Sequence, residues 1–191
     1  GSNAGLIIDK NVDLANVVQK CVMGAFSNQG QVCISLQRTY VMDEIFDEFI
    51  EQFSEMTKKL VVGSPFDPAT DISAMIATSE SERALEWVEE AVGHGAEIIT
   101  GGKIENDVFQ PTILKNVNAI SKVSCQEVFA PIVGVSRISS IEEGIEAIND
   151  SSFGLQAGIF TNDIKTAFKA AKLLEVGGVM INDIPTYRVD Q

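Results

Sequence analysis

Asn28-Gln29-Gly30-Gln31-Val32-Cys33 is a polar turn that joins a segment with helical periodicity to a segment with the composition of a strand. Before the turn, apolar residues recur at the i, i+3, i+4, i+7 spacing of one helix face, which predicts a helix over residues 13–25. After the turn, residues 39–42 have strand composition. This part of the chain therefore has the helix–turn–strand order of an α/β protein.

The same alternation of strands and helices continues along the chain. We expect strands over residues 6–8, 39–42, 96–100, 111–114, 131–135, 155–161 and 178–182, and helices over residues 13–25, 46–60, 79–92, 140–148 and 164–174. This order predicts an α/β fold with a mostly parallel, twisted sheet that is flanked by helices. With 191 residues and no internal repeat or linker, residues 1–191 are expected to form a single domain.

Charge and composition argue against several classes of protein. The 27 acidic and 14 basic side chains give a net charge of −13, so we expect neither a nucleic-acid nor a membrane partner. The sequence contains no apolar run long enough to span a bilayer and no signal-peptide pattern. With three cysteines, no C-x-x-C pair and one histidine, we expect no disulfide framework, no metal site and a cytoplasmic location.

Cys33 is the candidate nucleophile, because its neighbours differ from those of a cysteine that only fills a core. A cysteine of that kind usually has apolar neighbours, whereas Cys33 follows Gln29-Gly30-Gln31-Val32, where amide groups can gather around a sulfur or an oxyanion. A catalytic thiol also needs a base, a cation or converging N–H groups. His94 is interpreted as the end of a helix, and Cys21 and Cys125 as packing residues. From the residues alone, a catalytic role and a structural role explain Cys33 equally well.

Several short motifs resemble, in order, those of the NAD(P)-dependent aldehyde dehydrogenase superfamily. The motif that carries the candidate nucleophile is Asn28-x-Gly30-Gln31-x-Cys33, followed by Arg38. The other motifs are Gly1-Ser2-Asn3-Ala4 with residues 9–14, Gly95-Ala96 with Gly101-Gly102, Phe109-x-Pro111-Thr112, Gln126-Glu127-Val128-Phe129-Ala130-Pro131, Asn149, Phe153-Gly154-Leu155, Phe160-Thr161 and Gly178-Val179-x-Ile181-Asn182. The resemblance thus extends over essentially the whole chain and does not depend on a single motif.

The resemblance implies a reaction and a set of site residues. In such enzymes the thiolate attacks an aldehyde to give a thiohemiacetal, a hydride passes to NAD or NADP, and the resulting thioester is hydrolysed to a carboxylate. Cys33 matches the nucleophile, Glu127 the glutamate that binds the nicotinamide-ribose hydroxyls, and Phe129 the aromatic residue beside the nicotinamide. The implied substrate is a small aldehyde, and the implied parent enzyme is a homodimer or homotetramer.

The resemblance also implies that the chain is the catalytic domain of a longer enzyme. The family's general base is a glutamate that would lie just ahead of this sequence, and the dinucleotide-binding half and the C-terminal oligomerisation strand would lie outside residues 1–191. The isolated chain is therefore expected to fold but to be inactive. Gly1-Ser2-Asn3-Ala4 is either a native segment or an expression scar. Gln126 and Ala130 replace the commoner Glu and Gly, and they leave Glu127 in register.

Two other functions stay open from the sequence. In a CoA-acylating relative, CoA and not water resolves the thioester, and the absence of a glutamate two positions before Gly1 would favour this reaction. A non-catalytic α/β scaffold domain descended from such an enzyme would carry an unreactive Cys33. Tyr187 and Arg188 match positions that line the substrate entrance in the family. Asn182 is interpreted as a polar tie at the end of a strand.

Overall fold

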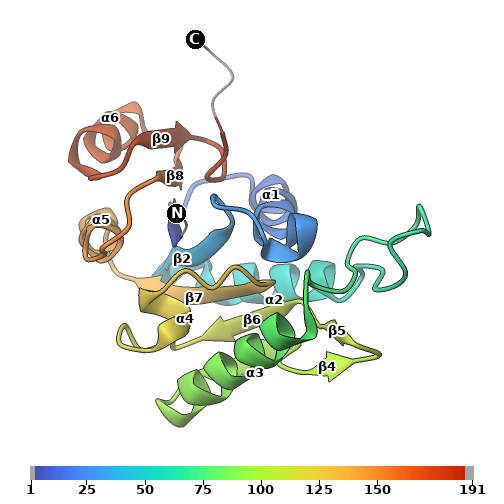
Figure 1. Ribbon diagram of the computed structural model, residues 1–191. Coiled ribbons are helices and arrows are strands. Elements are labelled where there is room, and N and C mark those ends of the chain that lie inside the picture. Colours follow the sequence, from blue (N-terminus) through green and yellow to red (C-terminus); the bar gives the residue numbers. More distant parts are fainter. Residues whose placement is uncertain (1–2, 188–191) are drawn as a thin grey trace.

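A seven-stranded sheet forms the centre of the computed structural model, which describes residues 3–187 (Figure 1). The strand order is β3-β6-β7-β2-β1-β8-β9, and every neighbouring pair is parallel except β3–β6. The strands are β1 (Ala4–Ile8), β2 (Leu36–Met42), β3 (Glu97–Thr100), β6 (Thr112–Lys115), β7 (Ile132–Ile138), β8 (Gln156–Phe160) and β9 (Gly178–Ile181). The mostly parallel α/β fold expected from the sequence is confirmed.

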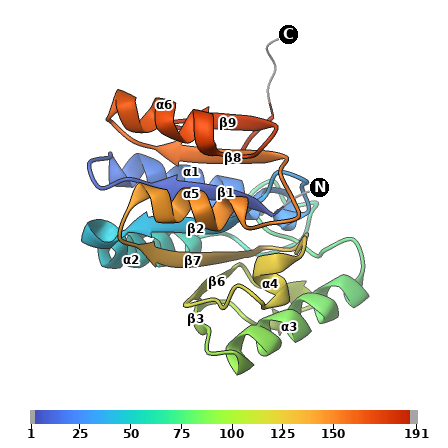
Figure 2. The same cartoon turned by 90° about the vertical axis from the view of Figure 1, so that its left-hand side faces the viewer.

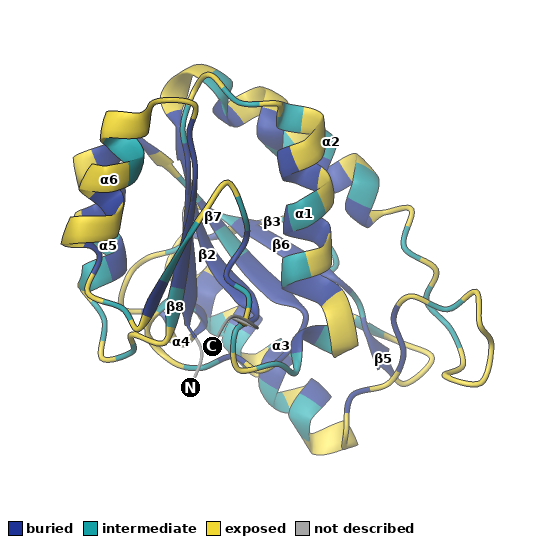
Figure 3. Ribbon diagram, turned by 90° about the horizontal axis from the view of Figure 1, so that it is seen from above, coloured by how far each residue is buried: buried dark blue, intermediate teal, exposed yellow. Residues whose placement is uncertain are grey.

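Helices cover both faces of the sheet (Figure 2). They are α1 (Leu14–Phe26), α2 (Phe46–Thr57), α3 (Thr78–Gly93), α4 (Lys122–Cys125), α5 (Ile141–Asn149) and α6 (Ile164–Leu173), with short 3₁₀ turns η1 (Ser27–Gly30) and η2 (Asp43–Ile45). Figure 3 shows the buried strands running between α1 and α2 on one face and α5 and α6 on the other. Phe49 belongs to the core of the first face and Ile145 to that of the second. A third cluster joins α3 and α4 to β6 through Phe109 and Leu114.

Polar caps explain why three of the helices begin where they do. Asp13, Ser140 and Asp163 each accept a hydrogen bond from a backbone N–H in the first turn of α1, α5 and α6. Such caps satisfy N–H groups that have no partner within the helix. The Glu143 carboxylate in turn accepts hydrogen bonds from the N–H and Oγ of Ser139, and these bonds lower the pKa of Glu143.

The structure differs from the sequence-based expectation in the region before β7. The expected strand over residues 96–100 is present as β3, but it runs antiparallel to β6 at one edge of the sheet. A small hairpin of β4 (Ile104–Glu105) and β5 (Val108–Phe109), and the single-turn helix α4, were not expected. Such short elements contain too few residues to show a period, so hydrophobic patterning does not reveal them.

The aromatic cluster between α1 and α2 provides a test of the core. The Phe53 ring is fully buried, and its centroid lies 5.2 Å from that of Phe49 and 6.1 Å from that of Phe26. Replacing Phe53 with alanine should lower the free energy of unfolding by about 3–5 kcal/mol, because it removes buried area and leaves a cavity. Urea unfolding monitored by circular dichroism would measure this loss.

Phe66 supplies a matched control, because its side chain is 95% exposed. Phe66→Ala should change the free energy of unfolding by no more than about 0.5 kcal/mol, as expected of an exposed side chain. Equal losses for the two variants would contradict the placement of α2 on the sheet.

Candidate active site

The turn that carries Cys33 has an unusual backbone. Asn28, Gln29 and Gly30 all have positive φ angles, at 51°, 58° and 66°. Three consecutive residues in the left-handed region are costly unless the surrounding structure holds them there. The side-chain amide of Asn28 donates to the carbonyl oxygen of Gln31 at 3.1 Å, which closes the turn. The Cys33 side chain that follows is exposed.

Gly30 presses this turn directly against a distant part of the chain. A Cβ atom added at Gly30 would lie 2.2 Å from the carbonyl oxygen of Ala130 and 2.8 Å from the nitrogen of Pro131. No side chain fits there, so the close approach of the two backbones requires glycine. The structure thus places the turn of Cys33 against the segment that carries Glu127 and Phe129.

The two segments meet at the amino ends of neighbouring strands. Cys33 precedes β2, which begins at Leu36, and Phe129 precedes β7, which begins at Ile132. β2 and β7 are paired in parallel, so the amino ends of both strands lie at the same end of the sheet. In open α/β sheets the usual ligand site lies beyond the carboxyl ends of the strands. This candidate site lies instead at the amino ends of β2 and β7.

Glu127 and Phe129 both reach the surface on the segment before β7. Glu127 is half-buried, and the Phe129 side chain is 38% exposed although it is a large apolar ring. Phe129 also has a positive φ of 51°, which is rare for a bulky residue and points to a functional constraint. The surface near the turn of Cys33 thus offers a carboxylate and an aromatic face.

The cysteines differ in their surroundings, and one expectation about them is wrong. Cys21 is fully buried in α1, and burial raises the pKa of its thiol, as expected of a packing residue. Cys125 was also expected to pack, but its side chain is exposed and its Sγ donates weakly to the carbonyl oxygen of Ile120 at 3.5 Å. Cys125 is the last residue of the single-turn helix α4, in which Val123 is the buried residue.

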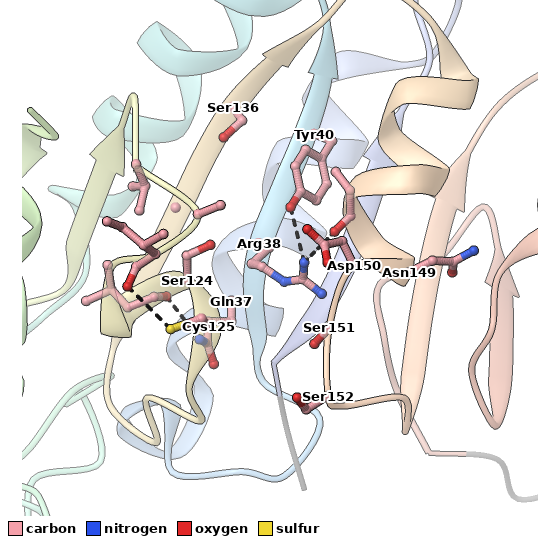
Figure 4. A pocket seen from close by; sticks show the side chains of 16 residues that line it. Gln37, Arg38, Tyr40, Ser124, Cys125, Ser136, Asn149, Asp150, Ser151 and Ser152 are labelled. Atoms are coloured by element: carbon pink, nitrogen blue, oxygen red, sulfur yellow. Dashed lines mark hydrogen bonds between the residues drawn. The ribbon is translucent and has the colours of Figure 1, made fainter. Parts of the chain in front are cut away.

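Cys125 lines a cavity of about 860 Å³ on the sheet face between α4 and α5 (Figure 4). Arg38 lies at its floor, and its guanidinium donates to the carbonyl oxygens of Asn3, Ala147 and Ile148 and to Oη of Tyr40. Arg38 on β2 therefore bonds α5 to the sheet. Although Arg38 belongs to the nucleophile motif, none of these hydrogen bonds is to Cys33.

Other residues of the sequence analysis lie in structural roles. His94 is the C-cap of α3, and its Nδ1 lies 3.0 Å from Oγ of Ser121. Asn182 accepts a hydrogen bond from the N–H of Thr161 at 2.9 Å, so the expected polar tie is confirmed. Tyr187 is exposed, and Arg188 lies outside the described residues.

Asn3 belongs to one of the motifs of the sequence analysis, but its structural role was not expected. It is buried, its amide donates to the carbonyl oxygens of Ser124 and Gln126, and its Oδ1 accepts from Oγ of Ser151. Its own carbonyl oxygen accepts from Arg38. Asn3 thus bonds the start of β1 to the segment that precedes Glu127. Its partners lie far away in sequence, so the sequence alone does not show these bonds.

Across residues 3–187, no group of three or more His, Cys, Asp or Glu side chains is arranged to hold a metal ion. None of the helices in this range has the length and apolar character needed to cross a membrane.

Comparisons with known proteins identify the family of the chain. Residues 1–191 match the aldehyde dehydrogenase family. The chain is 49% identical over 190 residues to 3-sulfolactaldehyde dehydrogenase from Priestia aryabhattai, and 40% identical over 190 residues to lactaldehyde dehydrogenase from Methanococcus aeolicus. Each alignment covers 100% of this chain, but only 40% and 41% of the respective relative.

A solved structure shows the same fold. The glyceraldehyde-3-phosphate dehydrogenase GapN from Methanocaldococcus jannaschii, crystallised with NADP, superposes with a TM-score of 0.94 at 38% identity. The match covers 98% of this chain and 41% of that one. The chain therefore spans about 40% of the length of the curated relatives it matches, and it belongs to the aldehyde dehydrogenase family.

Proposed function

We propose that the protein of which this chain forms a part oxidises a small aldehyde to a carboxylate, with NAD or NADP as hydride acceptor. The contact of Gly30 with Ala130 and Pro131 supports this proposal, because Gly30 belongs to the turn that ends at the exposed Cys33 and Ala130 follows Phe129 directly in the chain. Residues 1–191 are the nucleophile-bearing catalytic domain. The longer relatives support a parent whose remaining length supplies the dinucleotide-binding half, the general base and an oligomerisation strand.

Cys33 acts as the nucleophile. Its thiolate attacks the carbonyl carbon, a C–S bond forms, and the carbonyl oxygen becomes an oxyanion that the backbone N–H of Cys33 stabilises. Loss of a hydride from that carbon gives a thioester, and attack of water on the thioester releases the carboxylate and restores the thiol. The exposure of Cys33 allows a carbonyl compound to reach the sulfur.

Glu127 and Phe129 fit the nicotinamide end of the cofactor. A half-buried carboxylate can accept hydrogen bonds from both hydroxyls of a ribose, and an exposed aromatic ring can pack beside a flat heterocycle. When bound, NAD or NADP supplies the hydride acceptor that the reaction needs. The role of Glu127 and Phe129 is to hold that acceptor beside the turn of Cys33.

The relatives favour a small hydroxyaldehyde as the substrate. Two of them are named for 3-sulfolactaldehyde and lactaldehyde. Tyr187, near the end of the described chain, is an exposed side chain that could contact a polar substrate.

We also propose that the parent is a cytoplasmic homodimer or homotetramer. The free thiols of Cys21, Cys33 and Cys125 suit a reducing compartment, and β9 is an edge strand that could pair with another chain.

Replacing Cys33 with alanine in the full-length protein should lower the rate of aldehyde oxidation by about a thousandfold or more, since no thiohemiacetal can form. Reduction of NAD or NADP, followed by absorbance, measures this rate. Cys125→Ala is the matched control, because it also removes an exposed thiol, and it should keep the wild-type rate. Wild-type turnover by the Cys33 variant would refute the assignment.

Thiol reactivity separates the enzyme from a non-catalytic scaffold. Mild alkylation of the native protein at neutral pH should modify Cys33 fastest, Cys125 more slowly and Cys21 last. Burial raises the pKa of Cys21 and shields it, so Cys21 stays a neutral thiol until the protein unfolds. Mass spectrometry of tryptic peptides gives the three rates, and a Cys33 no faster than Cys125 would favour the scaffold.

Replacing Glu127 with glutamine in the full-length protein should slow hydride transfer by about 10- to 100-fold, because the neutral amide holds the ribose hydroxyls less firmly. Single-turnover measurement of the reduced cofactor isolates this step. The alkylation rate of Cys33 should not change. Hydride transfer at the wild-type rate would remove Glu127 from the site.

A further inference from the structure

The segment around Glu127 has no regular secondary structure, yet its backbone is firmly held. Gln126, Glu127 and Val128 lie between the end of α4 and the start of β7, outside any helix or strand. The N–H of Gln126 donates to the carbonyl oxygen of Lys122 at 3.0 Å, and the other bonds to this segment described below come from side chains of distant elements. The most extensive of these contacts come from Gln37 on β2, a side chain that is 3% exposed and lies beside the cavity in Figure 4.

We propose that Gln37 is a positioning residue that fixes the orientation of Glu127, and this inference depends on the proposed cofactor role of Glu127. The Gln37 Nε2 donates to the carbonyl oxygens of Gln126 at 2.6 Å and Val123 at 3.0 Å. Its Oε1 accepts from the backbone N–H of Val128 at 3.2 Å. One amide therefore holds the peptide groups on both sides of the Glu127 Cα.

Holding those two peptide groups sets the direction of the Cα–Cβ bond of Glu127, from which its side chain starts. The φ and ψ angles of a residue describe how its two flanking peptide planes are rotated about its Cα. With both planes bonded to a single amide, the backbone of Glu127 has little freedom to rotate. A site residue held in this way does not have to be ordered when its ligand binds.

Gln37 is itself well placed to act as a rigid support. Its strand, β2, is paired with β1 on one side and β7 on the other, so it lies inside the sheet. Only a side chain with both a donor and an acceptor can make the three bonds, and an amide has both. In a buried environment, bonds of this kind resist exchange with water.

Arg83 of α3 holds the next peptide group along the segment. Its guanidinium donates to the carbonyl oxygen of Val128 at 2.8 Å and is itself oriented by the carboxylate of Glu80 at 2.7 Å. Asn3 also donates to the carbonyl oxygen of Gln126, at 3.2 Å. These contacts keep the segment in place when Gln37 is replaced, so the expected change is a reorientation of Glu127 and not a loss of the fold.

The test uses Gln37→Met in the full-length enzyme, which keeps the length of the side chain and removes all three bonds. Single-turnover hydride transfer should slow by about 10- to 100-fold, the range expected for a misplaced reacting group. The alkylation rate of Cys33 and the KM for the aldehyde should stay at the wild-type values. Gln37→Glu is a second variant that keeps the acceptor for Val128 but loses the donor, and it should also slow hydride transfer.

Thr39→Val is the matched control on the same strand. Thr39 is 1% exposed, and its hydroxyl oxygen has no hydrogen-bond partner among the described residues. The change therefore removes a buried polar group of similar size without breaking a bond. Hydride transfer by Thr39→Val should match the wild type.

A double variant decides whether Gln37 acts through Glu127. In the Glu127→Gln background, Gln37→Met should cause no further slowing, because the group that it positions is already impaired. Slowing that adds to that of Glu127→Gln would assign Gln37 a general structural role and overturn the inference. If Gln37→Met transfers hydride at the wild-type rate while Glu127→Gln is slow, the positioning role of Gln37 is overturned and the cofactor role of Glu127 stands. Wild-type transfer in Glu127→Gln would instead refute the cofactor role proposed for Glu127.

Discussion

The close contact of Gly30 with Ala130 and Pro131 is the constraint on which the candidate site depends. It brings two backbones together at a distance that only glycine permits. The turn before β2 and the segment before β7 are far apart in sequence, and the parallel pairing of these strands brings their amino ends to one edge. The contact holds the turn that carries Cys33 against the segment that carries Glu127.

Much of the fold could be predicted from the sequence because it depends on local periodicity. The apolar stripes of α1 and α2 mark these helices within a few residues of their observed ends. Strand direction is a different matter, since β3 has ordinary strand composition and its antiparallel pairing with β6 comes from the path of the chain between them. The β4–β5 hairpin and α4 were missed because each is too short to show a period.

The candidate site could be predicted only in part. Motif resemblance singled out Cys33, Glu127 and Phe129, but no pattern of residues states that Cys33 is exposed or that Gly30 presses on Ala130. The expectation that Cys125 packs in the core was wrong, because the exposure of a residue at the end of a single helical turn depends on the neighbouring chain. Supporting residues such as Asn3 and Gln37 are identified by partners that lie far away in sequence.

The geometry of the site also explains why its support comes from side chains. Gln126, Glu127 and Val128 lie before β7 and outside any strand, so strand pairing does not satisfy their peptide groups. A buried peptide group without a partner costs about 1–3 kcal/mol, and several such groups would make the segment unstable. Gln37, Asn3 and Arg83 supply the missing bonds from β2, the start of the described chain and α3. The close approach at Gly30 and the side-chain bonds of Gln37, Asn3 and Arg83 are therefore parts of one arrangement, which holds the irregular segment of the half-buried Glu127.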